Sequence, residues 1–320
     1  MRRVLALASL LLLLAAPLAA PLASLAPAPA LPAVQPDVPA ATDPIATVWA
    51  FEDEVYSGTA GIRTRAIAVP SDWDRAVLVF RERPEGDPWD RLFAAFVGGV
   101  EVLRGTTPRT DMTVSKDVTE FRSLLPEGGV ADLGIYTDTY VGAMVVSARV
   151  EFYRDEPTGA LASPADSVVA PFTFRGVCAD GQARTAQVQF PATPPSSAEV
   201  ELYITGHGAA EFWYLNGLAP RYFRVLVDGT EVATAVVMPY TYAFVGFDGT
   251  LGATHGPVWW TAQRAMDLAG VPDGVGEIPP YRATLIGDHL GLLAGARTIS
   301  LVPSGGSCSW PTSVNFLLHA

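Results

Sequence analysis

Short apolar runs separated by turn residues recur along most of the chain. The run 144–153 shows the pattern most clearly, because Val146, Ala148, Val150 and Phe152 fall on one face and polar residues fall between them. A period of two is typical of a strand with one face in the core and one face in solvent. We therefore expect a half-buried antiparallel strand at this run.

Similar runs predict further strands on both sides of a polar break at 154–164. Before the break they are 66–69, 76–80, 92–97 and 133–136, and after it they are 168–174, 186–190, 200–205, 222–227, 232–238, 282–286, 298–302 and 313–318. Asp228-Gly229, between two of these runs, predicts a tight hairpin, because glycine readily adopts a positive φ. Helix is expected only at 119–125 and 261–271.

Many short strands with few helices predict an all-β chain. The break at 154–164 contains proline and glycine, and it divides the strands into two groups. We therefore expect two β-sandwiches side by side, an N-terminal domain over 45–158 and a C-terminal domain over 159–320.

The first residues have the order of a secretory signal. Arg2 and Arg3 precede an apolar run rich in leucine and alanine, which Pro17 interrupts. This run is shorter than the roughly 20 apolar residues that a membrane-spanning helix needs. We expect a signal peptide within 1–30, an extended Ala/Pro-rich tether over 31–44, and a mature protein that is extracellular or periplasmic without a membrane span.

The net charge and the cysteine and histidine content bear on possible partners, disulfides and metal sites. The net charge of −12 argues against a nucleic-acid partner, because phosphate binding needs a basic face. Cys178 and Cys308 are the only cysteines, and in an exported chain they predict one disulfide. The four histidines show no metal-binding spacing, so we expect neither a metal nor another cofactor.

One segment with candidate chemistry lies between the predicted strands 76–80 and 92–97. It places Trp89, Asp90 and Arg91 at the edge of a sheet. A carboxylate beside an aromatic ring and a guanidinium can bind a polar ligand and transfer a proton. The simpler interpretation of three such residues is an Asp-Arg pair on a solvated hairpin end.

A second segment follows the predicted strand 200–205. Glu211 precedes three aromatic residues, of which Trp213 is the middle one. A carboxyl group held against aromatic surface is desolvated, which favours its protonated form and makes it a proton donor. A glutamate at the rim of an exposed loop is the alternative. His207, between two glycines, is either a turn residue or a group that contacts substrate.

Several segments occur in the order found in one enzyme family. They are Pro88-Trp-Asp-Arg91, Thr107-Pro108, Asp117-Val-Thr-Glu-Phe-Arg-Ser-Leu-Leu125, Ile135-Tyr-Thr-Asp-Thr-Tyr140 and Thr205-Gly-His-Gly-Ala-Ala-Glu-Phe-Trp213. Over roughly 45–302 the chain resembles the peptide-N-glycosidase F family, and its Glu-Phe-Trp-Tyr segment is closer to the related plant-type amidase A. The resemblance implies two jelly-roll β-sandwiches in contact, with the active site in the cleft between them.

The resemblance also implies site residues. The principal catalytic aspartate falls on Asp90 and the second-domain glutamate on Glu211. A third carboxylate falls on Asp138, where the family usually has glutamate followed two positions on by tryptophan; here that later residue is Tyr140. A substrate-contacting arginine falls on Arg282. The cysteines that often bracket the family's catalytic segments are absent.

The implied reaction is hydrolysis, without metal, of the amide that joins an N-glycan to asparagine, which yields aspartate and a glycosylamine. We expect Asp90 to act as base or to orient water, and Glu211 to act as acid or to polarise the carbonyl, with the reverse division open. The residues expected to bind substrate are Trp89, Arg91, Tyr140, His207, Trp213 and Arg282. The predicted protein is a monomeric amidase acting on N-glycopeptides or N-glycoproteins; the alternative is a non-catalytic carbohydrate-binding protein on the same scaffold.

Overall fold

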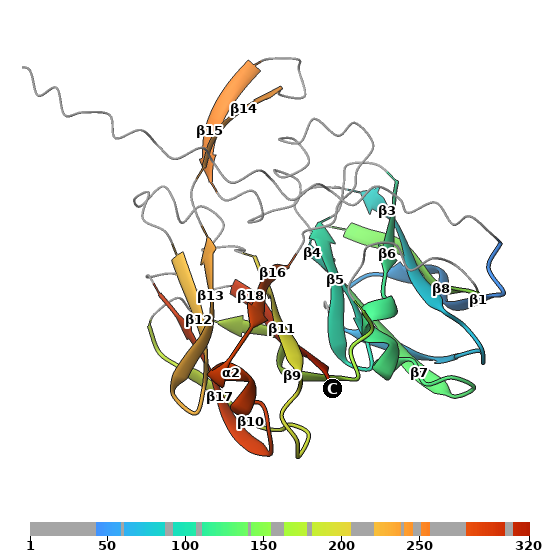
Figure 1. The fold of residues 1–320 in the computed structure, drawn as a ribbon. Helices are drawn as coiled ribbons and strands as arrows, with labels where there is room; N and C mark the ends of the chain where they lie inside the picture. The colour runs from blue at the N-terminus through green and yellow to red at the C-terminus, as the bar shows by residue number, and fades with distance from the viewer. Residues whose placement is uncertain are drawn as a thin grey trace, which may run out of the picture. The chain divides into compact units, whose positions relative to one another are not determined.

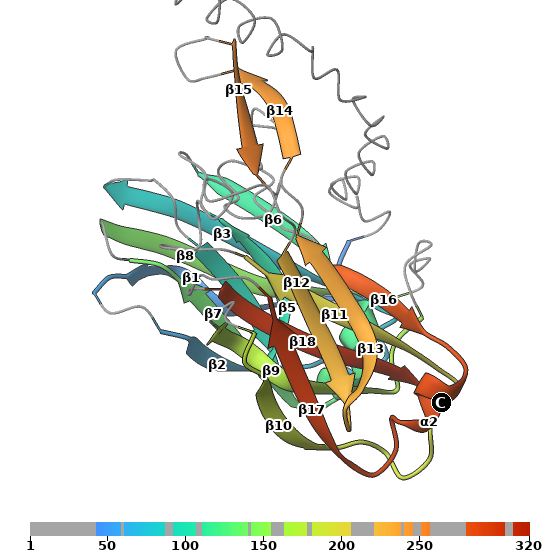
Figure 2. The same ribbon diagram turned by 90° about the vertical axis from the view of Figure 1, so that its left-hand side faces the viewer.

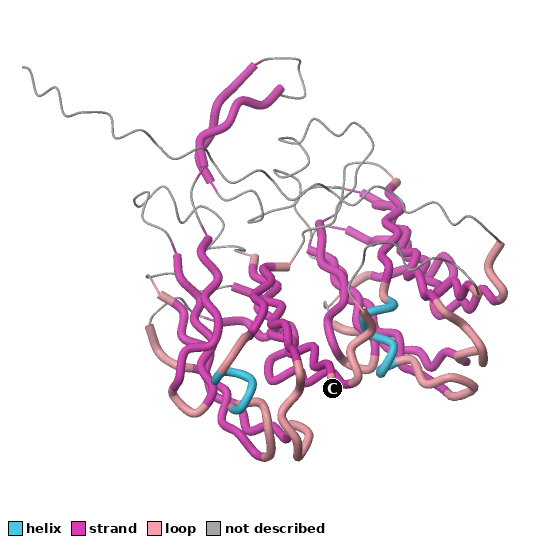
Figure 3. Tube along the Cα trace, in the orientation of Figure 1, coloured by secondary structure: helices cyan, strands magenta, loops and turns pink. Residues whose placement is uncertain are grey.

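The computed structural model describes residues 43–58, 61–86, 92–106, 111–139, 142–154, 163–177, 181–205, 221–237, 240–245, 251–256, 280–304 and 310–320. Figure 3 shows that these residues are mostly strand. The helical elements among them are short, a 3-10 helix and a four-residue α-helix. The all-β prediction is therefore confirmed. None of the described helices is long and apolar enough to cross a membrane.

Eight N-terminal strands form two antiparallel four-stranded sheets (Figure 1). The first sheet has the order β1-β8-β3-β6, with β1 at Ala46–Tyr56, β8 at Gly142–Tyr153, β3 at Arg75–Gly86 and β6 at Met112–Asp117. The second has the order β2-β7-β4-β5, with β2 at Arg63–Ala68, β7 at Val130–Thr137, β4 at Leu92–Val97 and β5 at Val100–Thr106.

The C-terminal strands repeat this plan (Figure 2). One sheet has the order β10-β17-β12-β13, with β10 at Arg184–Gln189, β17 at Ala296–Pro303, β12 at Arg221–Val227 and β13 at Thr230–Val237. The other has the order β16-β11-β18-β9, with β16 at Tyr281–Leu285, β11 at Ser197–Ile204, β18 at Trp310–His319 and β9 at Ser167–Val177. Strands β14 (Tyr240–Val245) and β15 (Leu251–Gly256) pair as a separate hairpin.

The strand order is nested in both halves. In the first half β1 pairs with β8, β2 with β7, β3 with β6 and β4 with β5. In the second half β9 pairs with β18, β10 with β17, β11 with β16 and β12 with β13. A long hairpin of four strand pairs rolled into two sheets has this order, so it supports the jelly-roll interpretation. The domain limit at 158–159 stays a prediction, because residues 155–162 lie outside the described part.

Each half has its own apolar core between its two sheets. The inward residues of β8 are fully buried, as the alternation predicts: Val146, Ala148, Val150 and Phe152. Its outer face is more covered than predicted, because Tyr153 packs beside Val77 and Val79 of β3. The rings of Phe80 and Phe93 stack at 4.7 Å in the first core.

The structure corrects the predicted extent of one strand. β3 does not end near residue 80 but continues to Gly86, because residues 81–86 stay in register with β8. Side chains alternate along this extension, so Glu82 is buried while Arg81 and Arg83 are exposed. Thr137 donates a hydrogen bond to one of the buried carboxyl oxygens of Glu82 and so satisfies part of its hydrogen-bonding capacity.

The remaining local predictions have different outcomes. A short 3-10 helix at Thr119–Leu124, η1, confirms the helical turn expected at 119–125. Asp228 and Gly229 both have positive φ, 47° and 86°, in the tight turn between β12 and β13. The helix expected at 261–271 lies outside the described residues, and a four-residue helix α2 at Asp288–Gly291 was not predicted.

Candidate functional site

Two of the predicted site residues, Asp138 and Arg282, lie within the described structure. The others lie outside it: Trp89, Asp90, Arg91, Tyr140, His207, Glu211 and Trp213. Cys178 and Cys308, which we expect to form a disulfide, lie outside it as well. What the structure describes of the candidate site is therefore Asp138, Arg282 and the strand ends that flank the other residues.

Asp90 falls between the end of β3 and the start of β4 at Leu92. Leu92 pairs with Thr106, the last residue of β5. The residue after Leu92 pairs with Thr137, the last residue of β7. The start of β4 and the ends of β5 and β7 therefore form one edge of the first sandwich.

Asp138, directly after β7, is bonded to the start of β4. Its Oδ2 atom accepts a hydrogen bond of 3.1 Å from the amide of Leu92, and its own amide donates one of 2.9 Å to the Leu92 carbonyl. The Tyr136 hydroxyl donates to Oδ1. Burial raises the pKa of Tyr136, and the neighbouring Asp138 charge raises it further, so this hydroxyl keeps its proton at neutral pH. Asp138 thus holds Leu92, the first residue of β4, which closely follows Asp90 in the chain.

Glu211 falls between the end of β11 and the start of β12. Ile204, the last residue of β11, pairs with Thr312 near the start of β18. Leu202 pairs with Tyr281, the first residue of β16. One edge of the second sandwich therefore carries the end of β11, the start of β18 and the start of β16.

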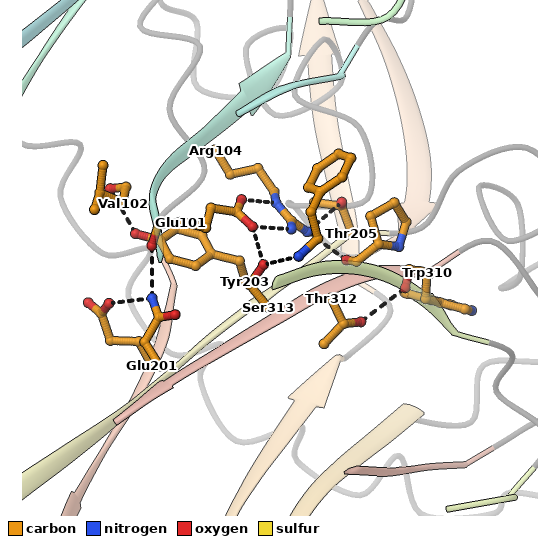
Figure 4. A network of polar contacts seen from close by, with 12 residues as sticks. Glu101, Val102, Arg104, Glu201, Tyr203, Thr205, Trp310, Thr312 and Ser313 are labelled. Atoms are coloured by element: carbon orange, nitrogen blue, oxygen red, sulfur yellow. Dashed lines mark hydrogen bonds and ion pairs between the residues drawn. The ribbon is translucent and has the colours of Figure 1, made fainter. Parts of the chain in front are cut away.

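Arg104 of β5 joins these two edges. Its Nη1 atom donates a 3.1 Å hydrogen bond to the Thr205 hydroxyl and a 2.6 Å hydrogen bond to the Pro311 carbonyl. Nearby, the Tyr203 hydroxyl donates a 2.9 Å hydrogen bond to the carbonyl of Val102. Figure 4 shows Arg104 and Val102 of the first sandwich lying against Tyr203 and Thr205 of the second. The edges that flank Asp90 and Glu211 are therefore hydrogen-bonded to each other.

The other donors of Arg104 are taken by Glu101 on the same strand. Arg104 Nε lies 2.6 Å from Glu101 Oε1 and Nη2 lies 2.7 Å from Oε2, and both side chains have no exposed surface. Ser313 also donates to Glu101, and Asn315 donates a 2.8 Å hydrogen bond to the Glu101 carbonyl. A buried ion pair is tolerated when its hydrogen bonds are satisfied in this way.

A β-bulge allows this pairing. Residues three apart on a regular strand point to opposite faces. In β5, however, Phe96 pairs with Glu101 and Ala95 pairs with Leu103, which leaves Val102 as an extra residue. The bulge turns Glu101 and Arg104 to the same side. Val102 and Leu103 are both fully buried in the first core, although they are adjacent in sequence.

Sequence reasoning did not find Glu101 or Arg104. A glutamate and an arginine in the otherwise apolar run Val100-Glu-Val-Leu-Arg104 were the available signal. A strict period of two would have placed the two charges on opposite faces, because a bulge has no reliable mark in a single sequence.

The bonds above form one path through the strand ends. Asp138 is hydrogen-bonded to Leu92, and Leu92 is paired with Thr106. Arg104 stands two residues before Thr106 and is hydrogen-bonded to Thr205, which immediately precedes residues 206–220. Asp138 is therefore part of this path. Asp90 and Glu211 belong to segments that adjoin it in the chain, at Leu92 and at Thr205.

Arg282 of β16 makes a second contact between the sandwiches, and its side chain is more exposed than that of Arg104. Its Nη2 atom is 2.6 Å from Glu120 of η1 and 2.5 Å from Glu201 of β11, and its Nη1 atom is 3.5 Å from Glu199. Burial acts to lower the pKa of Arg282, but the charges of Glu201 and Glu120 outweigh it and raise the pKa above its usual range. The guanidinium that we expected to contact substrate thus holds three carboxylates together.

Glu201 is the buried centre of this cluster. Its carboxyl group has no exposed surface and lies 3.4 Å from the amide nitrogen of Asn315. Burial raises the pKa of Glu201, while Arg282 lowers it; Glu120 raises it again, Lys116 and Asn315 lower it, and the net result is about 7. A group that titrates near neutral pH therefore lies between the two sandwiches.

The described residues contain no group of three or more His, Cys, Asp or Glu side chains arranged to hold a metal ion. The chemistry that the described site offers consists of carboxylates, arginines and hydroxyl groups. These can orient a polar substrate and, through the carboxylates, accept or donate protons.

The chain was compared with solved structures. PNGase F from Flavobacterium meningosepticum, described as a glycosylasparaginase, aligns with a TM-score of 0.60 at 15% identity, over 86% of this chain and 96% of that one. PNGF-II aligns with a TM-score of 0.60 at 14% identity, over 86% of this chain and 65% of that one. At these identities the likeness shows that the fold is shared.

Sequence comparison gives the family. A curated relative, the peptide-N4-(N-acetyl-beta-glucosaminyl)asparagine amidase A of Prunus dulcis, is 26% identical over 62% of this chain. The chain spans about two-fifths of that relative's length (41%). The family described as peptide N-acetyl-beta-D-glucosaminyl asparaginase amidase A matches residues 64–263, which is more than half of the chain. The chain therefore belongs to this amidase A family.

Proposed function

We propose that this protein hydrolyses the amide between an N-glycan and asparagine in glycoproteins or glycopeptides. The observation that carries the proposal is the Arg104–Thr205 hydrogen bond, because it joins the strand edges that flank Asp90 and Glu211. The family match, the name of the Prunus dulcis relative and the fold shared with PNGase F support the same reaction.

The reaction requires one base and one acid. Water attacks the carbonyl carbon of the linking amide, the C–N bond breaks, and the departing nitrogen takes a proton. The products are aspartate and a glycosylamine. We assign the base or water-orienting role to Asp90 and the acid or carbonyl-polarising role to Glu211, because two carboxylates in different environments can divide these tasks.

Asp138 has a supporting part in this proposal. Both of its carboxylate oxygens accept hydrogen bonds, from Tyr136 and from the Leu92 amide. Bonds to both oxygens hold this carboxylate in one orientation, which suits it to fixing Leu92, the start of the strand that follows Asp90 in the chain. We therefore assign Asp138 to positioning of Asp90, in addition to any contact with the sugar.

Export completes the proposal. The Arg2-Arg3 start and the following leucine-rich run support secretion to the extracellular space or the periplasm. The expected result of sequencing the native N-terminus is a chain that lacks at least the first 20 or so residues. A native protein that begins at Met1 would contradict export by this signal.

The experiment is glycan release from a defined N-glycopeptide, followed by mass spectrometry of the peptide. The wild type should convert the glycosylated asparagine to aspartate, and Asp90→Asn should not. Asp132→Asn is a matched control, because Asp132 is an exposed aspartate on β7 of the same sandwich. Glycan binding without release by the wild type would favour the carbohydrate-binding alternative, and equal turnover by Asp90→Asn would remove Asp90 from the mechanism.

A further inference from the structure

The contact between the two sandwiches includes a hydrogen bond to Thr205, at the end of β11. Thr205 is fully buried, follows the last residue of β11, and immediately precedes the segment 206–220 that contains Glu211. Its hydroxyl accepts the 3.1 Å hydrogen bond from Arg104 Nη1. The last described residue before Glu211 is thus bonded to the other sandwich through its side chain.

Arg104 is held in one orientation. Glu101 takes Nε and Nη2 in a bidentate pair, which leaves Nη1 pointing at Thr205 and at the Pro311 carbonyl. A planar guanidinium with a fixed fork has little freedom to rotate once two of its nitrogens are paired. The ring of Phe174 lies 5.3 Å from the guanidinium carbon and limits its movement further.

The strand that carries Arg104 also supports the segment with Asp90. Thr106, two residues after Arg104, pairs with Leu92, which closely follows Asp90 in the chain. A shift of Arg104 relative to β11 would therefore change the separation between the anchors of Asp90 and Glu211. Acid–base catalysis by two carboxylates is sensitive to such a shift, because an error of about 1 Å can reduce the rate roughly 10²-fold.

We propose that Arg104 is a positioning residue, which acts through Thr205 to hold the strand end that leads to Glu211 at a fixed separation from the strand start that follows Asp90. The inference rests on the proposed amidase function. Arg104 does not touch the reacting atoms in this proposal. Its contribution is to the turnover number, since the hydrogen bond fixes Thr205, which precedes the segment with Glu211, relative to the strand that pairs with Leu92.

The test removes one hydroxyl group and keeps the ion pair. Thr205→Val has nearly the same shape as the wild type and leaves the Glu101–Arg104 pair in place. Thr205→Ser restores the hydroxyl. Thr312→Val is the matched control: Thr312 is also fully buried, but its hydroxyl donates to the Trp310 carbonyl on its own strand and does not link the sandwiches (Figure 4).

The expected result is a roughly 10–10²-fold lower kcat for Thr205→Val with a nearly unchanged KM, measured on an N-glycopeptide. Thr205→Ser should recover most of the kcat. Thr312→Val should keep a wild-type kcat even if its melting temperature falls as much as that of Thr205→Val. A lower kcat in Thr205→Val than in Thr312→Val, at equal loss of melting temperature, would not arise from loss of stability alone.

Hydrogen exchange of the peptides that cover 203–215 gives a second readout, which does not depend on activity. Exchange there should be faster in Thr205→Val than in Thr312→Val. Equal kcat and equal exchange in the two variants would overturn the inference. A wild type that releases no glycan would instead overturn the proposed function, and exchange would then still decide whether Arg104 anchors this segment.

Discussion

Glu201→Gln is expected to change how stability depends on pH. Glu201 is buried between the sandwiches, where burial raises the pKa of its carboxyl group from 4.5 to about 7. Arg282 and Lys116 oppose this rise and Glu120 adds to it. A neutral glutamine removes the titration while keeping the size and much of the polarity of the side chain.

The sign follows from proton binding. Between pH 4.5 and about 7 the folded state keeps the Glu201 proton that the unfolded state has lost. Unfolding therefore releases a proton in this window, and the stability that Glu201 contributes falls as the pH rises. The contribution is fully present below pH 4.5 and is lost above about pH 7. A rise of this size corresponds to about 3 kcal/mol.

The assay is urea unfolding of the wild type and Glu201→Gln at closely spaced pH values through the titration window. The wild type should lose about 3 kcal/mol relative to Glu201→Gln as the pH rises through it. Glu199→Gln is the control, since Glu199 is partly exposed and also pairs with Arg282, so it should keep the wild-type slope. Equal pH slopes for Glu201→Gln and the wild type would refute the assignment of the titrating group.

The other predictions concern the site, the cysteines and the ion pair. Asp90→Asn should lower kcat by roughly 10²–10⁴ without loss of folding, and the effect of Glu211→Gln should not add to it; additive effects would indicate that the two carboxylates act separately. Thiol titration of the unfolded, unreduced protein should find no free thiol, because we expect a Cys178–Cys308 disulfide, and two thiols would refute it. Arg104→Met should lower the free energy of unfolding by about 3–5 kcal/mol, because Glu101 would stay buried without its partner, and a loss below about 1 kcal/mol by urea titration would contradict this.

Strand periodicity predicted most of the fold. The alternation at 144–153 identified β8, and Asp228-Gly229 identified the hairpin between β12 and β13, because local residue types determine these features. β5 was missed, since its bulge and its two charged residues break the alternation. The two charges satisfy each other across the bulge, and residues far away in sequence, such as Thr205 and Ser313, supply further hydrogen bonds.

The candidate site was predicted less completely. Asp138 was expected from the resemblance alone, and its hydrogen bonds to Leu92 and Tyr136 could not be derived from the spacing of residues. Arg282 was expected to contact substrate, and the structure adds its three carboxylate partners. Such contacts join residues far apart in sequence, Asp138 and Leu92 within one sandwich and Arg282 and Glu120 between the sandwiches, and the local pattern of a sequence does not determine them.

The central claim is tested most directly by the origin of the new carboxylate oxygen. The wild type is incubated with an N-glycopeptide in water labelled with the heavy isotope of oxygen, and the peptide product is analysed by tandem mass spectrometry. Amide hydrolysis predicts aspartate at the former glycosylation site with one labelled oxygen in its side chain, together with the intact glycan. Peptide that keeps asparagine at this position, with or without a residual sugar, would contradict the account.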